Sequence, residues 1–114
     1  MTQYNYRFGK ILVVREQEKN ESEMAYKESI RVFEGIATKL YDLLKKKENL
    51  INFQQERLQY GSSIDEINHY ARFIDSLEKT ITDVQQKVGQ ARAKMNWHEQ
   101  KLLQKKNLKK QNFK

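Results

Sequence analysis

The sequence predicts an all-α fold in which two long helices form an antiparallel coiled-coil hairpin. Three observations lead to this prediction. The 114 residues include no proline and only four glycines, so few residues interrupt a helix. Hydrophobic residues recur at alternating steps of three and four, which is the spacing of a coiled-coil seam. One clear turn signal, Gly61-Ser62-Ser63, lies near the middle of the chain.

The turn signal divides the chain into two helices of similar length. Gly61 suits the position just after a helix end, where a positive φ is needed. Ser63 followed by Glu66 is typical of the capping box that begins a helix. We therefore predict a single domain made of one antiparallel coiled coil. It comprises residues 1–114, with a helix over about 6–60, a turn over about 61–63 and a helix over about 64–114.

The predicted second helix carries the more regular seam. Apolar or aromatic residues fill ten of its eleven seam positions, and His98 is the exception. The seam residues are Ile67, Tyr70, Ile74, Leu77, Ile81, Val84, Val88, Ala91, Met95, His98 and Leu102. A stripe sustained over this length is the signature of coiled-coil packing. No glycine, proline or cap ends it, so we expect the native protein to continue beyond Lys114.

The predicted first helix follows the same spacing less regularly. Its seam residues are Tyr26, Ser29, Phe33, Ile36, Leu40, Leu43, Lys47 and Leu50. A turn centred on Gly61 places Leu40 near Val84, so the apolar parts of the two seams face each other. The core should therefore be built mainly from Phe33, Ile36 and Leu40 on the first helix and Ile74, Ile81, Val84 and Val88 on the second.

The seam of the first helix becomes polar towards the N-terminus. Arg15 and Lys19 would face Leu102 and Lys105 there, and like charges at facing positions weaken a coiled coil. We therefore expect tight packing near the turn and fraying near the two termini.

The formal net charge is +7, and it is concentrated at the C-terminal end. No acidic residue follows Glu99, whereas six lysines do: Lys101, Lys105, Lys106, Lys109, Lys110 and Lys114. Such an end can contact an acidic protein surface, a phosphate or an anionic lipid, or it can simply be a solvated helix end. The chain has no cysteine, no long apolar stretch and no secretory signal, so the cytoplasm is the default location.

The sequence does not favour an enzyme. The two histidines, His69 and His98, lie far apart on one predicted helix and cannot share a metal. There is no metalloprotease or phosphate-binding motif, and a two-helix structure offers no cavity in which carboxylates could be desolvated. We expect no catalytic residue, no metal, no cofactor and no small-molecule substrate.

Two general kinds of binding protein remain, a structural coiled-coil adaptor and a basic nucleic-acid-binding protein. Tyr41, Phe73 and Trp97 lie outside the strict seam, where aromatic residues either anchor an interface or cover the flanks of the core. A generic structural coiled-coil adaptor would need no more than this. A basic helical nucleic-acid-binding protein would fit the lysines, but no binding module is visible and we expect no specific nucleic acid.

One segment is more specific. Residues 68–81 contain the pattern Tyr-x-x-Phe-Ile-x-x-Leu-Glu-x-x-Ile, which is matched by Tyr70, Phe73, Ile74, Leu77, Glu78 and Ile81. The segment resembles the hallmark region of the FliJ family, small coiled-coil proteins of the bacterial flagellar export apparatus. Residues 6–12, Tyr-Arg-Phe-Gly-Lys-Ile-Leu, are similar to the opening of that family.

The resemblance implies a non-enzymatic component of flagellar type III protein export. Members of the family bind the export ATPase ring as a central-stalk-like element, contact the export-gate membrane protein and handle empty export chaperones. The protein would then be cytoplasmic and would reach the cytoplasmic face of the inner membrane, at the flagellar basal body, only through its partners.

The resemblance also implies where the partners bind. The candidate export-gate contacts are Leu43, Leu50, Tyr70, Phe73 and Leu77, and the candidate ATPase contacts are Phe8, Lys10, Arg15, Lys105 and Lys109. The family often has tyrosines on the first helix where this chain has Lys46 and Leu50, so the first-helix part of the gate contact departs from the family pattern.

Overall fold

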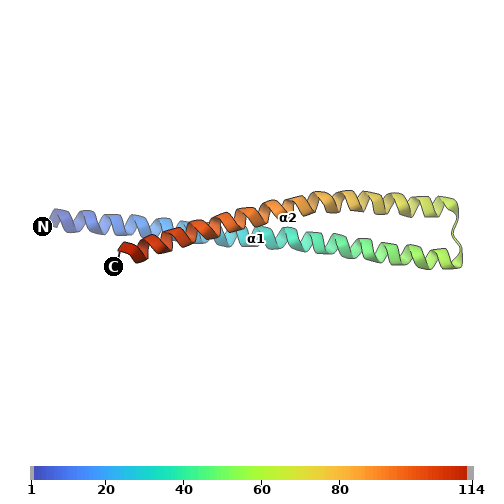
Figure 1. Ribbon diagram of the computed structural model, residues 1–114, viewed down its shortest axis with the longest axis horizontal. Coiled ribbons are helices and arrows are strands. Elements are labelled where there is room, and N and C mark those ends of the chain that lie inside the picture. The colour runs from blue at the N-terminus through green and yellow to red at the C-terminus, as the bar shows by residue number, and fades with distance from the viewer. Residues whose placement is uncertain (1, 113–114) are drawn as a thin grey trace. The chain divides into compact units, whose positions relative to one another are not determined.

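The computed structural model describes the backbone of residues 2–112 and the side chains of residues 7–107. Helix α1 spans Thr2–Tyr60 and helix α2 spans Ile64–Asn112 (Figure 1). Lys47 of α1 contacts Glu78 of α2, and Phe53, further along α1, contacts Tyr70, which comes earlier on α2. The helices therefore run antiparallel and pack against each other, which confirms the predicted all-α hairpin fold.

The turn is held by local hydrogen bonds at both helix ends. Gly61 has a φ of +87°, and its N–H donates to the carbonyl oxygen of Leu58 at 3.4 Å. At the start of α2, the N–H of Glu66 donates to the Ser63 hydroxyl at 3.2 Å. The second bond satisfies one of the amide groups that the first turn of a helix leaves without a helical partner.

Contacts divide the chain into two compact units. We call Phe33–Ala91, which contains the turn, the turn unit. The terminal unit pairs the residues of α1 up to Val32 with the residues of α2 from Arg92 onward. Both helices run through both units.

The core of the turn unit follows the predicted seam. Leu77, Ile81, Val84 and Ala91 are buried, and Val84 is only 2% exposed. Every other seam position predicted in this unit is half-buried: Phe33, Ile36, Leu40, Leu43, Lys47, Leu50, Ile67, Tyr70, Ile74 and Val88. Half-buried Lys47 places its Nζ 3.2 Å from a carboxylate oxygen of Glu78, so its charge has an acidic partner across the pair.

The expected tight packing next to the turn is wrong. The seam residues nearest the turn, Leu50, Ile67 and Tyr70, are only half-buried, and burial is most complete further away, between Leu77 and Ala91. The reason lies in α1. Continuing its seam beyond Leu50 by steps of four and three reaches Gln54 and Arg57, which are polar. The apolar seam of α1 therefore ends nearly three turns before the helix does.

The terminal unit has a thinner and more polar core. Leu102 is buried, and the buried Ser29 hydroxyl donates to the carbonyl oxygen of Tyr26 at 2.6 Å. Arg15 is exposed and Lys19 is half-buried, as the polar seam predicted. Lys105, however, lies 3.7 Å from a carboxylate oxygen of Glu18, so an acidic residue outside the seam relieves part of the expected repulsion.

Candidate functional site

The described residues hold no group of three or more His, Cys, Asp or Glu side chains placed to share a metal ion. Within the same part of the chain, neither helix contains a stretch long and apolar enough to cross a membrane. The features with a distinctive geometry are two surfaces, one in each unit.

The first surface is an aromatic patch in the turn unit, which we define by Phe53, Tyr70 and Phe73 with the cations Lys46 and Arg57. The rings of Phe53 and Tyr70 meet edge to face, with their centroids 5.6 Å apart. The Nζ of Lys46 lies 5.5 Å from the centroid of Phe73, and the guanidinium carbon of Arg57 lies 5.9 Å from that of Phe53. Cations over exposed rings contribute roughly 0.5–1 kcal/mol each.

Heptad geometry explains why these residues meet. Positions e and g border the a and d seam on its two sides. Lys46 and Phe53 are g positions seven residues apart on α1, and Phe73 is a g position on α2. The contact between Lys46 and Phe73 places the g flanks of the two helices side by side. Aromatic and arginine side chains are enriched among the residues that anchor protein interfaces.

The structure separates the five candidate gate residues by burial. Phe73 is 42% exposed and Tyr70 is half-buried, and both belong to the aromatic patch. Leu43 and Leu50 are half-buried in the seam, and Leu77 is only 8% exposed. In this hairpin Leu77 therefore belongs to the core, and the accessible part of the candidate contact is centred on Phe73.

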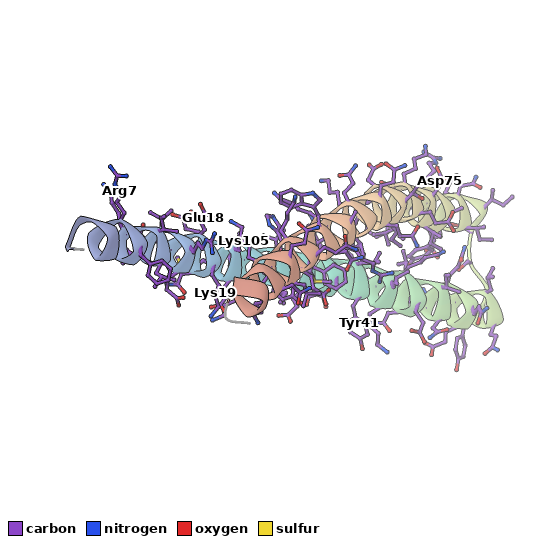
Figure 2. The ribbon with its side chains drawn as sticks, turned by 60° about the vertical axis from the view of Figure 1, so that its left-hand side comes forward. Arg7, Glu18, Lys19, Tyr41, Asp75 and Lys105 are labelled. Atoms are coloured by element: carbon purple, nitrogen blue, oxygen red, sulfur yellow. The ribbon has the colours of Figure 1, made fainter. Side chains whose placement is uncertain are left out.

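Sequence reasoning missed Phe53 and Arg57 as members of this patch. The available signal was the heptad position of Phe53, which is on the same flank as Lys46 and faces the start of α2. Tyr41 was singled out with Phe73, but it is a b position that projects away from α2, and it does not join the patch (Figure 2).

The second surface is the start of α1 in the terminal unit, residues 7–15, which we call the basic apolar end. Its large apolar side chains are exposed: Phe8, Ile11, Val13 and Val14. Lys10 and Arg15 are exposed among them, and no acidic residue lies in this segment. At 3.6 residues per turn, Phe8 and Val13 lie about 140° apart around the helix, so no single face holds the apolar groups.

Of the candidate ATPase residues, Phe8, Lys10 and Arg15 are exposed in the basic apolar end. Lys105 lies instead on α2 beside Glu18, as Figure 2 shows. The side chain of Lys109 is outside the described residues. Sequence reasoning did not include Ile11, Val13 and Val14 among the candidates, because these apolar residues do not keep the seam spacing.

The remaining off-seam aromatic, Trp97, lies in the terminal unit on α2. Its ring meets that of His98 edge to face at 4.9 Å, and the Nζ of Lys101 lies 5.4 Å from its centroid. Trp97 is exposed, so this arrangement covers only part of the ring.

In the terminal unit, the ion pair between Glu28 and Arg31 shifts the pKa of both side chains. Two nitrogens of the Arg31 guanidinium donate to the two carboxylate oxygens of Glu28 at 3.0 and 2.6 Å. These hydrogen bonds hold the pKa of Glu28 below its usual value and raise that of Arg31. Both groups are fully solvated, so the pair orders two side chains on the surface and contributes little to folding.

Comparison with known proteins identifies the family. The family model of the flagellar FliJ protein matches residues 4–114. The flagellar FliJ protein of Bacillus subtilis (strain 168) is 37% identical over 110 residues, which cover 96% of this chain and 74% of that relative. No solved structure matches the chain. With nearly all of its residues matched by the family model, the chain belongs to the flagellar FliJ protein family.

Proposed function

We propose that this chain is a non-enzymatic element of flagellar protein export that binds the export ATPase ring as a central stalk and links it to the export gate and to empty export chaperones. Membership of the FliJ family supports the export apparatus as its place of action. The single observation that carries the ATPase contact is the basic apolar end, where apolar side chains are exposed on several sides of α1.

The physical argument concerns how such a helix end can be covered. A helix that is apolar on one side needs one neighbour, whereas a helix that is apolar on several sides needs to be surrounded. A ring of subunits around a central opening would do this. Lys10 and Arg15 would favour an opening with acidic residues. Because the contacts would differ from one ring subunit to the next, they could bias the nucleotide cycle of the ring.

The ATPase contact is tested by measuring ATP hydrolysis and ring formation by the purified export ATPase at increasing concentrations of this chain. Phe8→Ser and Val13→Ser, made separately, remove apolar groups from different sides of α1. If the ring surrounds the helix, each variant should raise the concentration needed for half-maximal effect by about tenfold, since interface anchors contribute about 1–2 kcal/mol or more.

Met24→Ser is the control, because Met24 is an exposed apolar residue of α1 outside the basic apolar end. It should behave as the unaltered chain does. The stalk proposal fails if saturating amounts of the chain change neither the hydrolysis rate nor ring formation. A loss caused by only one of the two variants would indicate a partner that contacts a single side of the helix.

For the export gate, we propose that the aromatic patch is the docking surface. Phe73 supplies an accessible aromatic anchor, and Lys46 and Arg57 add positive charge beside the rings. Gate binding would also bring the otherwise cytoplasmic chain to the inner membrane at the basal body. The chaperone contact is proposed from the family alone and is assigned to no residue.

The gate contact is tested by titrating the cytoplasmic part of the gate protein with the full chain and with Phe73→Ala. The affinity should fall by at least about tenfold while the circular dichroism spectrum stays unchanged. Tyr41→Ala is the control, because it removes an exposed aromatic side chain of the same unit from outside the patch. Equal losses for both variants would place the contact elsewhere.

A further inference from the structure

A second row of exposed apolar residues runs along the turn unit outside the seam. On α1, Leu44, Ile51 and Leu58 are spaced by seven and occupy e positions. Leu44 is 43% exposed, Leu58 is 48% exposed and Ile51 is half-buried. A two-helix coiled coil needs apolar residues only at a and d, whereas apolar residues at a, d and e are typical of a helix with more than one neighbour.

The e positions of α2 continue this row. Ile64, which is 75% exposed, and Ala71, which is also exposed, are e positions seven residues apart at the start of α2. In an antiparallel pair, like flanks face each other, as the contact between Lys46 and Phe73 shows on the g side. The e residues of the two helices therefore share the flank opposite the aromatic patch. We call Leu44, Ile51, Leu58, Ile64 and Ala71 the lateral strip.

The dimensions of the lateral strip suit one helix. Leu44 and Leu58 are fourteen residues apart, which corresponds to about 21 Å along the helix axis. This is the length of two heptads. Tyr41 lies one turn before Leu44 and adds an exposed aromatic side chain beside the same row. An amphipathic helix of two heptads could thus place its apolar face along the whole strip.

The charges that border the strip are acidic. Beside the strip, the b positions include Glu48 on α1 and Asp75 on α2, with Glu78 at the next e position of α2. All three are exposed, and none of the e or b positions of the turn unit carries a basic residue. Asp75 projects from the outer side of α2 (Figure 2).

Lysines from other positions pair with all three acids. Lys45 lies 3.9 Å from Glu48, Lys47 lies 3.2 Å from Glu78 and Lys79 lies 3.4 Å from Asp75. Lys45 and Lys79 are f positions on the outer sides of the helices, and such exposed pairs contribute little and exchange easily. A basic partner could therefore bind the acidic border with little loss.

From this geometry we propose that the lateral strip docks an amphipathic helix of a partner protein, about two heptads long, whose apolar face is bordered by Lys or Arg. A second copy of this chain is disfavoured as the occupant, because a two-fold contact would bring one acidic border against another. The proposal does not depend on the ATPase or gate contacts, which use other surfaces.

The test uses the full chain and two labelled fourteen-residue amphipathic peptides that share one apolar face. One peptide has Lys at the bordering positions and the other has Glu. Fluorescence anisotropy should show saturable binding of the Lys-bordered peptide, with an affinity at least about tenfold higher than that of the Glu-bordered peptide and falling with added salt. Equal affinities for the two peptides would overturn the proposal.

Two variants locate the binding. Leu44→Gln with Leu58→Gln should weaken binding of the Lys-bordered peptide by at least about tenfold. The matched control, Met24→Gln with Leu103→Gln, removes two exposed apolar side chains from the terminal unit and should bind normally. Equal binding by the strip variant and the control would contradict the proposal.

The border is tested without altering the apolar residues. Glu48→Lys with Asp75→Lys should reverse the preference, so that the Glu-bordered peptide binds better. Because both positions are exposed, this variant should fold even if the strip variant does not. Sedimentation of the full chain provides a further check. A dimer that the strip variant abolishes would identify a second copy as the occupant and would refute the proposed partner.

Discussion

Leu77 offers the sharpest test of which candidate residues hold the hairpin together and which are free to bind a partner. It belongs both to the seam and to the segment that resembles the family's hallmark region. The structure leaves it only 8% exposed, whereas its neighbour Phe73 is 42% exposed. Truncation of the two side chains to alanine should therefore have different consequences.

The magnitude for Leu77→Ala follows from its burial. The substitution removes three carbon atoms from a nearly buried site, and each buried carbon contributes about 0.8 kcal/mol. The free energy of unfolding should therefore fall by about 2 kcal/mol. This is the low end of the range for core leucines, because a two-helix core is open at its flanks and neighbouring side chains can close part of the space.

Phe73→Ala should cost somewhat less, roughly 1–1.5 kcal/mol, because full burial of such a side chain contributes about 1.5–3 kcal/mol and nearly half of this one is already in water. The assay is urea unfolding followed by circular dichroism, with the transition midpoint and its slope compared among the unaltered chain and the two variants. Met24→Ala, at a site that is 70% exposed, should leave the midpoint nearly unchanged.

The result that would refute this reasoning is a Leu77→Ala variant that unfolds within about 0.5 kcal/mol of the unaltered chain. Such a chain would not use the a and d seam of α2 as its core. Leu77 would then be available as a direct contact for a partner, and the division between core and aromatic patch would have to be abandoned.

Three further predictions concern the turn and one surface pair. Gly61→Ala should lower the free energy of unfolding by about 1 kcal/mol, because a φ of +87° strains any residue with a Cβ. The added methyl group would meet no other atom, so the backbone strain is the only cost. Urea unfolding measures the change, and an unchanged stability would argue against the turn geometry. Ser63→Ala should cost a similar amount, about 1 kcal/mol, through loss of the cap on α2, and a stability equal to that of the unaltered chain would contradict the cap. Arg31→Gln should return the pKa of Glu28 towards its ordinary value, as an NMR titration of the carboxyl carbon can show. Because the folded pKa of Glu28 is lowered, any stability from the pair is present above the ordinary pKa and is lost as the pH falls through the lowered one; an unshifted titration in the unaltered chain would refute the pair.

The candidate site was only partly predictable from the sequence. Phe73 could be identified, because its segment resembles a family pattern and it lies beside the seam. Its neighbours could not, since Phe53 lies on the other helix and the pairing of the g flanks depends on the register of the hairpin. The pairing of Lys105 with Glu18 has the same origin, because no local pattern links residues so distant in the chain.

The sequence by itself determined the helices, the turn and the seam. Missing prolines, one Gly-Ser-Ser signal and steps of three and four act over a few residues, so they can be read without knowing what lies across the molecule. Tertiary structure decided how far each seam residue is buried. It showed that packing weakens near the turn, where Gln54 and Arg57 replace apolar residues on α1, and that Leu77 is core while Phe73 is surface. The physical reason is that the burial of a residue depends on the side chains that face it. The local sequence of one helix does not specify which residues of the other helix those are.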